Sequence, residues 1–230
     1  MKDGGRRDML WEFCKAHWQK TLPDWPIFEG EGVVEGLFSR SEAINNASKA
    51  AEPWDAALII DGDVVLESPT LAEAAIHGTI DTGKMTYAFN WKYQLNEAGT
   101  RRLMEEGIFS REDPWLEQPY GSYGPTNSSA MAINRALWEE INGFDERFYG
   151  WGCEDWAFLA ACDALRGGVT RNSGKVFHLW HPRSHDWEGG NPHYKANENI
   201  GRRYLYSKDK PDTMRCLIDE WRQIKDVRNG

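Results

Sequence analysis

The sequence predicts a single α/β domain over residues 1–230, built on a mainly parallel, twisted sheet flanked by helices. Helix and strand patterns alternate through the first half of the chain, as they do where helices connect parallel strands. Segment 56–60 (AALII) is an uninterrupted apolar run, which a strand buried on both faces needs. A length of 230 residues with 40% hydrophobic residues is enough to build such a core.

Apolar spacing and prolines divide the first half into helices and strands. The predicted helices have apolar residues on one face, and prolines follow the first two of them. The strands are short apolar or aromatic runs. The predicted helices cover 8–20, 39 or 41 to 51, and 69–77, and the predicted strands cover 56–60 and 86–91.

The second half opens with a segment that lacks such a pattern. Residues 96–128 are rich in glycine, proline and charge, and predict a long insertion or mobile loop. Asn-Gly at 142–143 and Gly-Gly at 167–168 are helix-stop signals. The remaining predictions are strands at 129–133 and 175–179, helices at 136–141 and 154–165, and a mostly helical tail from residue 197.

Charge and composition exclude some classes of protein. The formal net charge of −9 argues against a protein that binds along a nucleic-acid backbone, because such binding uses a clustered positive surface. No segment reaches the ~18 consecutive apolar residues of a membrane span, and no charged-then-apolar leader opens the chain. The four cysteines lack metal-finger spacing. We therefore expect a cytoplasmic protein with reduced thiols and no membrane span.

Two carboxylates directly follow the apolar strand. Asp61 and Asp63 are separated by Gly62, which lets the backbone turn sharply between them. Ligands of open α/β sheets sit at the carboxyl ends of strands. Mg²⁺ and Mn²⁺ take carboxylate oxygens and commonly share a phosphate-bearing substrate. The pair therefore predicts a metal site, and the alternative is a solvated acidic turn.

A second motif spans residues 142–155 (NGFDERFYGWGCED). Two glycines bracket Trp151, so this loop can bring its backbone and an aromatic face close to a ligand. Glu154 and Asp155 then begin a helix, where the helix dipole favours ionised carboxylates. The alternative is an ordinary helix start with acidic residues in its first turn.

Two histidines lie three residues apart at the end of a predicted strand. His178 and His181 stand in the segment VFHLWHP at 176–182. Either is a candidate to add a nitrogen ligand to the metal. The alternative is a structural role, and the sequence leaves open which of the two binds.

Together these motifs resemble the GT-A fold glycosyltransferases, and most closely the beta-1,4-galactosyltransferase family. The family pattern Phe-Asn-Arg-Ala-x-x-x-Asn is similar to residues 38–45 (FSRSEAIN), and its metal motif falls on 61–63. Its loop Asn-Gly-Phe, followed by Gly-Trp-Gly-Gly-Glu-Asp, falls on 142–155, with Cys153 in place of a glycine. Its downstream Asn-Pro is present at 191–192, so the resemblance runs in order from roughly residue 36 to there.

The resemblance implies the GT-A fold and a metal-dependent, inverting transfer. A sugar would move from a nucleotide-diphosphate donor, with a uridine nucleotide favoured, to an acceptor hydroxyl. The implied cofactor is Mn²⁺ or Mg²⁺. The implied parts of the domain are a nucleotide and metal half (1–95), an acceptor half (96–195) and a helical tail (196–230).

The resemblance also implies a role for each matching residue. Asp155 would be the catalytic base, and Trp151 and Glu154 would bind the acceptor. The implied donor-binding residues are Arg6, Arg7, Phe38, Arg40, Asp61 and Gly62. The implied metal ligands are Asp61 and Asp63, with His178 or His181.

The chain departs from the family pattern in two places. The family begins with a strand that helps to hold the nucleotide, and no such strand precedes Arg6 and Arg7. Trp156 stands where the family has a third acidic residue, beside the acceptor. Two alternatives stay open: another enzyme of this fold, such as a retaining transferase or a nucleotidyltransferase, and a non-catalytic sugar- or nucleotide-binding module. A lid is expected in 96–128 or in 181–194.

Overall fold

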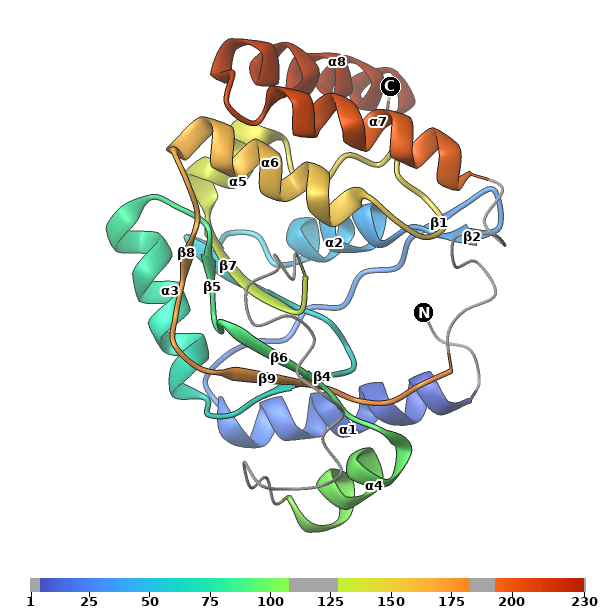
Figure 1. Cartoon of the computed structure of the whole chain (residues 1–230), viewed down its shortest axis with the longest axis vertical. Helices are drawn as coiled ribbons and strands as arrows, with labels where there is room; N and C mark the ends of the chain where they lie inside the picture. Colours follow the sequence, from blue (N-terminus) through green and yellow to red (C-terminus); the bar gives the residue numbers. More distant parts are fainter. Residues whose placement is uncertain (1–4, 108–127, 183–192, 230) are drawn as a thin grey trace.

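The computed structural model describes residues 5–107, 128–182 and 193–229, in which helices pack around short strands (Figure 1). The helices are α1 (Arg6–Thr21), α2 (Arg40–Ala50), α3 (Thr70–Thr82), α4 (Glu97–Glu106), α5 (Arg135–Ile141), α6 (Glu154–Arg166), α7 (Tyr194–Ser207) and α8 (Pro211–Asn229). The strands are β1 (Val33–Val34), β2 (Leu37–Phe38), β3 (Ala56–Ile60), β4 (Val64–Leu66), β5 (Thr86–Tyr87), β6 (Trp91–Gln94), β7 (Ala130–Asn134), β8 (Thr170–Arg171) and β9 (Lys175–His178). Figure 1 shows α6, α7 and α8 together on one side of the sheets, with α1 and α4 on the opposite side.

The strands form two mixed sheets and a separate antiparallel pair. The four-stranded sheet has the order β3-β7-β5-β8, in which β7 is antiparallel to both of its neighbours and β5 is parallel to β8. The three-stranded sheet has the order β4-β9-β6, with β9 antiparallel to β4 and parallel to β6. β1 pairs with β2 in a separate two-stranded sheet. The chain is therefore a mixed α/β protein, compatible with a glycosyltransferase domain.

The prediction of a mainly parallel sheet is wrong in its strand pairing. β3 and β5 run in the same direction, with α3 between them in the chain, but β7 lies between them in space and runs the opposite way. A connecting helix fixes only the relative direction of the two strands that it joins. It does not prevent a later strand from inserting between them, so alternation along the sequence overestimated the parallel pairing.

The predicted strand over 86–91 is two strands in two sheets. The backbone N–H of Ala88 donates to Ala130 O in β7, at 3.1 Å. The N–H of Asn90 donates to Gly174 O ahead of β9, also at 3.1 Å. The chain thus passes from one sheet to the other between β5 and β6, which one continuous strand pattern conceals.

A helix occupies the first part of the segment predicted as an insertion or loop. Asn96 caps α4, since its side chain accepts a hydrogen bond from Gly99 N, and Gly107 ends the helix in the left-handed conformation (φ 66°). A cap of this kind contributes about 1 kcal/mol. Leu103 anchors the helix in the core. Residues 108–127 lie outside the described part, as does most of the second predicted lid.

The core runs through both sheets and the helices that cover them. α1 packs on it through Leu10, Cys14 and Trp18. All four cysteines are free thiols. Within the described residues no strand precedes α1, and no helix there combines the length and the apolar character of a membrane span.

Candidate functional site

The turn between β3 and β4 sends its two carboxylates into different clusters. Asp61 follows β3, and its backbone N–H donates to Ser129 O ahead of β7, at 2.9 Å. Asp63 precedes β4, and its carbonyl accepts from Leu179 N just after β9, at 2.8 Å. Asp61 is therefore tied to the four-stranded sheet and Asp63 to the three-stranded sheet. Gly62 separates the two aspartates and packs against α1. A Cβ at this position would lie 3.0 Å from the ring of Trp11, so a larger residue would crowd that ring.

Asp63 forms a compact group with both histidines. Nε2 of His181 lies 3.1 Å from Oδ2 of Asp63, and Nε2 of His178 lies 3.6 Å from Oδ1. One ligand atom from each of the three side chains falls within 4.8 Å of the other two. The pairing of β4 with β9 creates this group, because Val64 stands opposite His178.

The chemistry of this group fits a divalent cation. Burial lowers the pKa of His178 and so favours the neutral imidazole, which is the form that binds metals. The side-chain amide of Gln94 lies 2.7 Å from Nδ1 of His178 and holds the ring by the nitrogen that faces away from Asp63. Burial acts to raise the pKa of Asp63, but the two imidazoles outweigh burial and lower it, so the carboxylate is ionised.

A second cluster is centred on Arg40, which joins Asp61 to Asp155. Its guanidinium nitrogens lie 2.7 and 3.2 Å from Oδ1 of Asp61, and a third lies 2.5 Å from Oδ1 of Asp155. Burial acts to lower the pKa of Arg40, but the two carboxylates outweigh it and raise the pKa, so the side chain stays charged. Asp61 thus pairs with an arginine. Among the described residues, the three side chains that lie close enough to share a metal ion are Asp63, His178 and His181, and Asp61 is not one of them.

Glu154 and Asp155 stand in the first turn of α6. Burial raises the pKa of both carboxyls, the charge of Arg40 opposes that rise, and the charge of Asp61 adds to it. A buried carboxyl whose pKa is raised can accept a proton at higher pH than an exposed one. Both carboxyls are therefore weaker acids than exposed ones, and Asp155 has the guanidinium of Arg40 fixed beside it.

Lys92 is a site residue that sequence reasoning missed. It lies on β6 two residues before Gln94, so strand alternation places it on the face that Gln94 shares with His178. Its charge acts on Asp63 in one cluster and on Asp155 in the other. The predicted strand stopped at residue 91, so the alternation of side chains along β6 could not be used to place Lys92 beside Gln94.

The two arginines at the start of α1 lie beside the end of β9. A terminal nitrogen of Arg7 is 3.2 Å from Nδ1 of His181. Arg6 donates to Trp180 O (3.1 Å) and pairs with Glu97 of α4 (2.7 Å). The structure thus brings Arg7 to the candidate metal-ligand group of Asp63, His178 and His181. Arg6 joins α1 to α4 and to the segment after β9.

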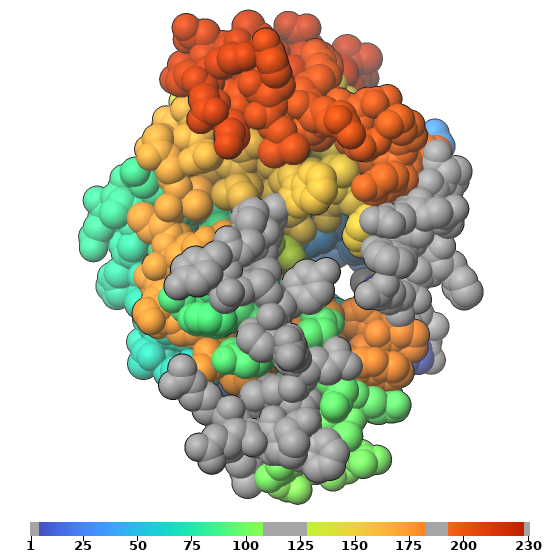
Figure 2. Space-filling view, viewed as in Figure 1, coloured from blue at the N-terminus to red at the C-terminus, as the bar shows by residue number. Residues whose placement is uncertain are grey.

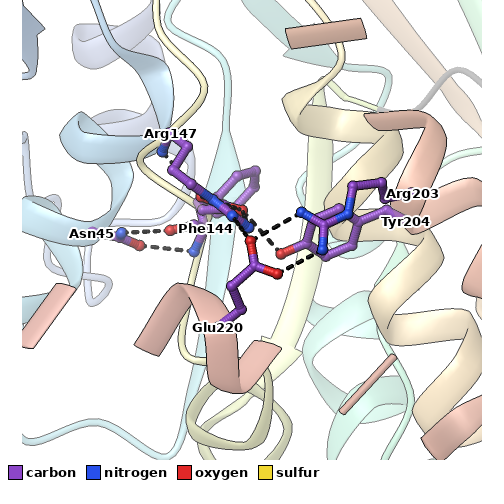
Figure 3. Close-up of polar contacts among 7 residues, drawn as sticks. Asn45, Phe144, Arg147, Arg203, Tyr204 and Glu220 are labelled. Atoms are coloured by element: carbon purple, nitrogen blue, oxygen red, sulfur yellow. Dashed lines mark hydrogen bonds and ion pairs between the residues drawn. The ribbon is translucent and has the colours of Figure 1, made fainter. Parts of the chain in front are cut away.

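The loop ahead of α6 is held first by α2. Asn45 donates to Phe144 O at 2.8 Å and accepts from Phe144 N at 2.9 Å, as Figure 3 shows. Gly143 is required here, because its φ is 67° and a Cβ would lie 2.5 Å from the Asn45 side-chain oxygen. Further along the loop, Gly150 N donates to the carbonyl of Phe38 at 2.9 Å. The motif around Phe38 therefore supports the loop through its backbone.

A polar network, buried at Asp145 and exposed at Arg203 and Glu220, joins the same loop to α7 and α8. Arg147 pairs with Asp145 at 2.6 Å and with Glu220 of α8 at 2.5 Å. The hydroxyl of Tyr204 donates to Asp145 at 3.0 Å, and Arg203 pairs with Glu220 at 2.6 Å (Figure 3). Asp145 is only 6% exposed. The loop is therefore fixed on two sides by elements distant in sequence.

Aromatic side chains stand at the outer edge of this loop. Trp151 is 39% exposed, and its ring stacks on Tyr194 of α7 with centroids 5.7 Å apart and planes inclined by 20°. Trp156 is 45% exposed. In Figure 2 the yellow atoms of the loop and of α6 and the orange atoms of the β9 segment are visible on the same face of the molecule.

A family model described as the N-terminal domain of galactosyltransferase matches residues 118–185. The chain resembles galactosyltransferases. This match confirms the resemblance expected from the sequence motifs, over a range that includes Asp155, His178 and His181. Arg40 and the turn at 61–63 lie outside it. No curated protein matches the chain in sequence.

The galactosyltransferase-like segment carries one substitution that its surroundings accommodate. Cys153 stands where the family pattern has glycine, at φ 76°. α7 presents Gly201 to it, and a Cβ on Gly201 would lie 2.9 Å from the Cβ of Cys153. Because residue 153 carries a side chain, residue 201 must be a glycine.

We expect Gly201→Ala to destabilise the protein by about 1–3 kcal/mol through overpacking, although alanine favours the helix by ~1 kcal/mol. Adding Cys153→Gly should restore the stability, because it removes both the clash and a residue strained at positive φ. Urea unfolding of the two single variants and the double variant measures this. Wild-type stability of G201A alone would show that α6 and α7 are packed less closely than described.

Proposed function

We propose that this chain is a metal-dependent, inverting glycosyltransferase that moves a sugar from a nucleotide-diphosphate donor to an acceptor hydroxyl. A UDP-linked donor is favoured by the resemblance to galactosyltransferases. The observation that carries the proposal is the juxtaposition of a metal-ligand group (Asp63, His178, His181) and a carboxylate group (Asp61, Asp155). The two groups meet at the turn between β3 and β4, where only Gly62 separates Asp61 from Asp63. Metal and base are the two functions that this transfer requires.

The metal-ligand group favours Mn²⁺ as the cofactor. Asp63 offers a hard oxygen, and His178 and His181 offer nitrogens. Mg²⁺ prefers an octahedral shell of oxygens, so two imidazoles argue for a transition-metal ion. When bound, such an ion neutralises the charge that develops on the leaving diphosphate.

The cationic side chains near this group supply binding for the donor. Arg7 lies beside His181, and Lys92 shares a strand face with Gln94. Both present donors suited to phosphate oxygens. We assign them to the diphosphate, and we assign Asp61, Gly62 and the Phe38 segment to the nucleoside side.

The carboxylate group activates the acceptor. Asp155 takes the proton of the acceptor hydroxyl as that oxygen attacks the anomeric carbon, and Arg40 holds the carboxylate in place through the 2.5 Å contact. Glu154 orients the hydroxyl. Trp151 is 39% exposed, and an indole ring is a surface on which a sugar can stack.

The test is to incubate the protein with a panel of nucleotide sugars, with and without Mn²⁺. Thermal unfolding and release of the nucleotide are measured for each sugar. Release of a nucleoside diphosphate that requires Mn²⁺ identifies a glycosyltransferase and names its donor, and product stereochemistry decides between inversion and retention. Release of inorganic diphosphate instead would indicate a nucleotidyltransferase. Stabilisation by a nucleotide without turnover would indicate the non-catalytic binding module.

We expect Asp63→Ala to abolish stabilisation by Mn²⁺, because one of three ligands and the only carboxylate among them is lost. At 100 times its Kd, an ion bound only by the native state stabilises by about 2.7 kcal/mol, which raises the Tm of a chain of this length by roughly 5–10 °C. Asp81→Ala, at an exposed position of α3, is the matched control. An undiminished Mn²⁺ shift in D63A would place the ion elsewhere.

A further inference from the structure

One face of α7 contacts the loop ahead of α6 along its length. The residues on it are spaced three or four apart, as neighbours on a helix surface are. Each meets a different part of the loop: Tyr194 stacks on Trp151, Asn197 bonds to backbone carbonyls, Gly201 meets Cys153, and Tyr204 bonds to Asp145. The helix therefore serves as the surface on which this loop takes its shape.

Asn197 makes the contact that bears most directly on Trp151. Its side-chain nitrogen donates to Tyr149 O at 3.0 Å and to Trp151 O at 3.4 Å. These carbonyls flank Gly150, whose φ of 69° lies in the left-handed region that glycine adopts most readily. One amide that bridges both carbonyls restricts rotation about the glycine between them.

The position of Asn197 is well suited to this task. The side chain is 1% exposed, so water does not compete for its donor. Its oxygen has no hydrogen-bond partner in the described structure, so only the donor half of the amide is in use. Tyr194 lies one turn earlier on the same helix, and its ring supports the Trp151 ring whose backbone Asn197 holds.

We propose that Asn197 is a positioning residue for the acceptor. It acts through the loop, without contact with either substrate, by fixing the direction of Trp151 and the entry of the chain into Glu154 and Asp155. The effect on the acceptor rests on the proposed function. The structural part of the inference, that the Asn197 amide orders the loop, does not depend on that function.

The structural part is tested by hydrogen exchange in Asn197→Leu, which keeps the branched shape of the side chain and loses the donor. We expect amides of residues 148–153, including the Gly150 N–H that bonds to Phe38 O, to exchange about tenfold faster, as loss of one hydrogen bond allows. Exchange in β3 and β7 should not change. Asn199→Leu, at an exposed position of the same helix, is the matched control. Unchanged exchange in the loop of N197L would overturn the proposal.

The catalytic part is tested by kinetics with the donor identified in the panel and with p-nitrophenyl glycosides of glucose, N-acetylglucosamine and xylose as acceptors. We expect the KM for the acceptor to rise about tenfold in N197L, while the KM for the donor and the rate of donor hydrolysis by water stay within about twofold. Donor hydrolysis that falls in parallel with transfer would reduce Asn197 to a residue of general stability.

The two experiments separate failure of this inference from failure of the proposed function. If the wild-type protein releases no nucleotide from any donor, the proposed function fails, while exchange still decides whether Asn197 orders the loop. If N197L does not fold, Asn197→Ser is used, because it keeps a donor too short to bridge both carbonyls. The same faster exchange in the loop is then expected, and wild-type exchange would overturn the proposal.

Discussion

We expect Asp155→Asn to lower sugar transfer about 10²–10⁴-fold, the range by which general-base assistance accelerates such a step. An asparagine accepts the hydrogen bond from Arg40 but cannot take a proton from the acceptor hydroxyl. Mn²⁺ and donor binding should persist, since Asp155 lies in the cluster around Arg40 and the metal-ligand group is separate from it. Thermal shifts with Mn²⁺ and donor, measured beside the transfer rate, test both halves.

Asp163→Asn is the matched control for that substitution. Asp163 lies later on α6, away from Arg40, and the same change of charge there should leave transfer at the wild-type rate. A transfer rate of D155N within a few fold of wild type would remove Asp155 from the catalytic role. Simultaneous loss of donor stabilisation would mean that the substitution disturbs the donor site and does not report on the base.

We expect Arg40→Met to cost about 3 kcal/mol of unfolding free energy, because it leaves Asp61 and Asp155 largely buried without their counter-charge. The three side chains are 18, 22 and 21% exposed, so water replaces little of the lost interaction. Adding Asp61→Asn should recover part of the loss. Urea unfolding measures both variants. The pKa of Asp155 rises further without the cation, so the acid limb of any residual transfer activity moves to higher pH.

Arg135→Met provides a matched comparison for Arg40→Met. Arg135 also bridges two carboxylates, those of Glu52 and Glu139, but these are 51 and 60% exposed. Exposed ion pairs contribute about 0–1 kcal/mol each. If R40M cost no more than R135M, burial of the Arg40 cluster would not be the source of its stability.

The sequence predicted best those features that depend on short stretches of chain. The strand over 56–60 has the predicted bounds, because five consecutive apolar residues between polar segments leave few alternatives. The helix stop at Asn142 is observed with the residue in the left-handed conformation (φ 62°). Each of these depends on side chains within a few residues of one another.

Features that depend on pairing between distant segments could not be predicted from the sequence. The antiparallel insertion of β7 and the separation of β5 from β6 are decided by which sheet a strand joins, and neither leaves a local pattern. Asp61 and Asp63 were expected to bind one ion, whereas Asp61 forms an ion pair with Arg40 of α2, a helix distant from the turn in sequence. Asn197 lay in a tail predicted only as helical, and its role depends on carbonyls almost fifty positions earlier.

A single residue separates Asp61 from Asp63, one carboxylate of each cluster. Two residues of extended chain span at most about 7 Å between Cα atoms, so the backbone keeps these two positions close whatever the side chains around them. The distance from Asp61 to the proposed base is set differently, by the Arg40 side chain that binds both Asp61 and Asp155. The separation between the proposed ion and the proposed base therefore has one part fixed by covalent bonds and one part that a substitution of Arg40 can change.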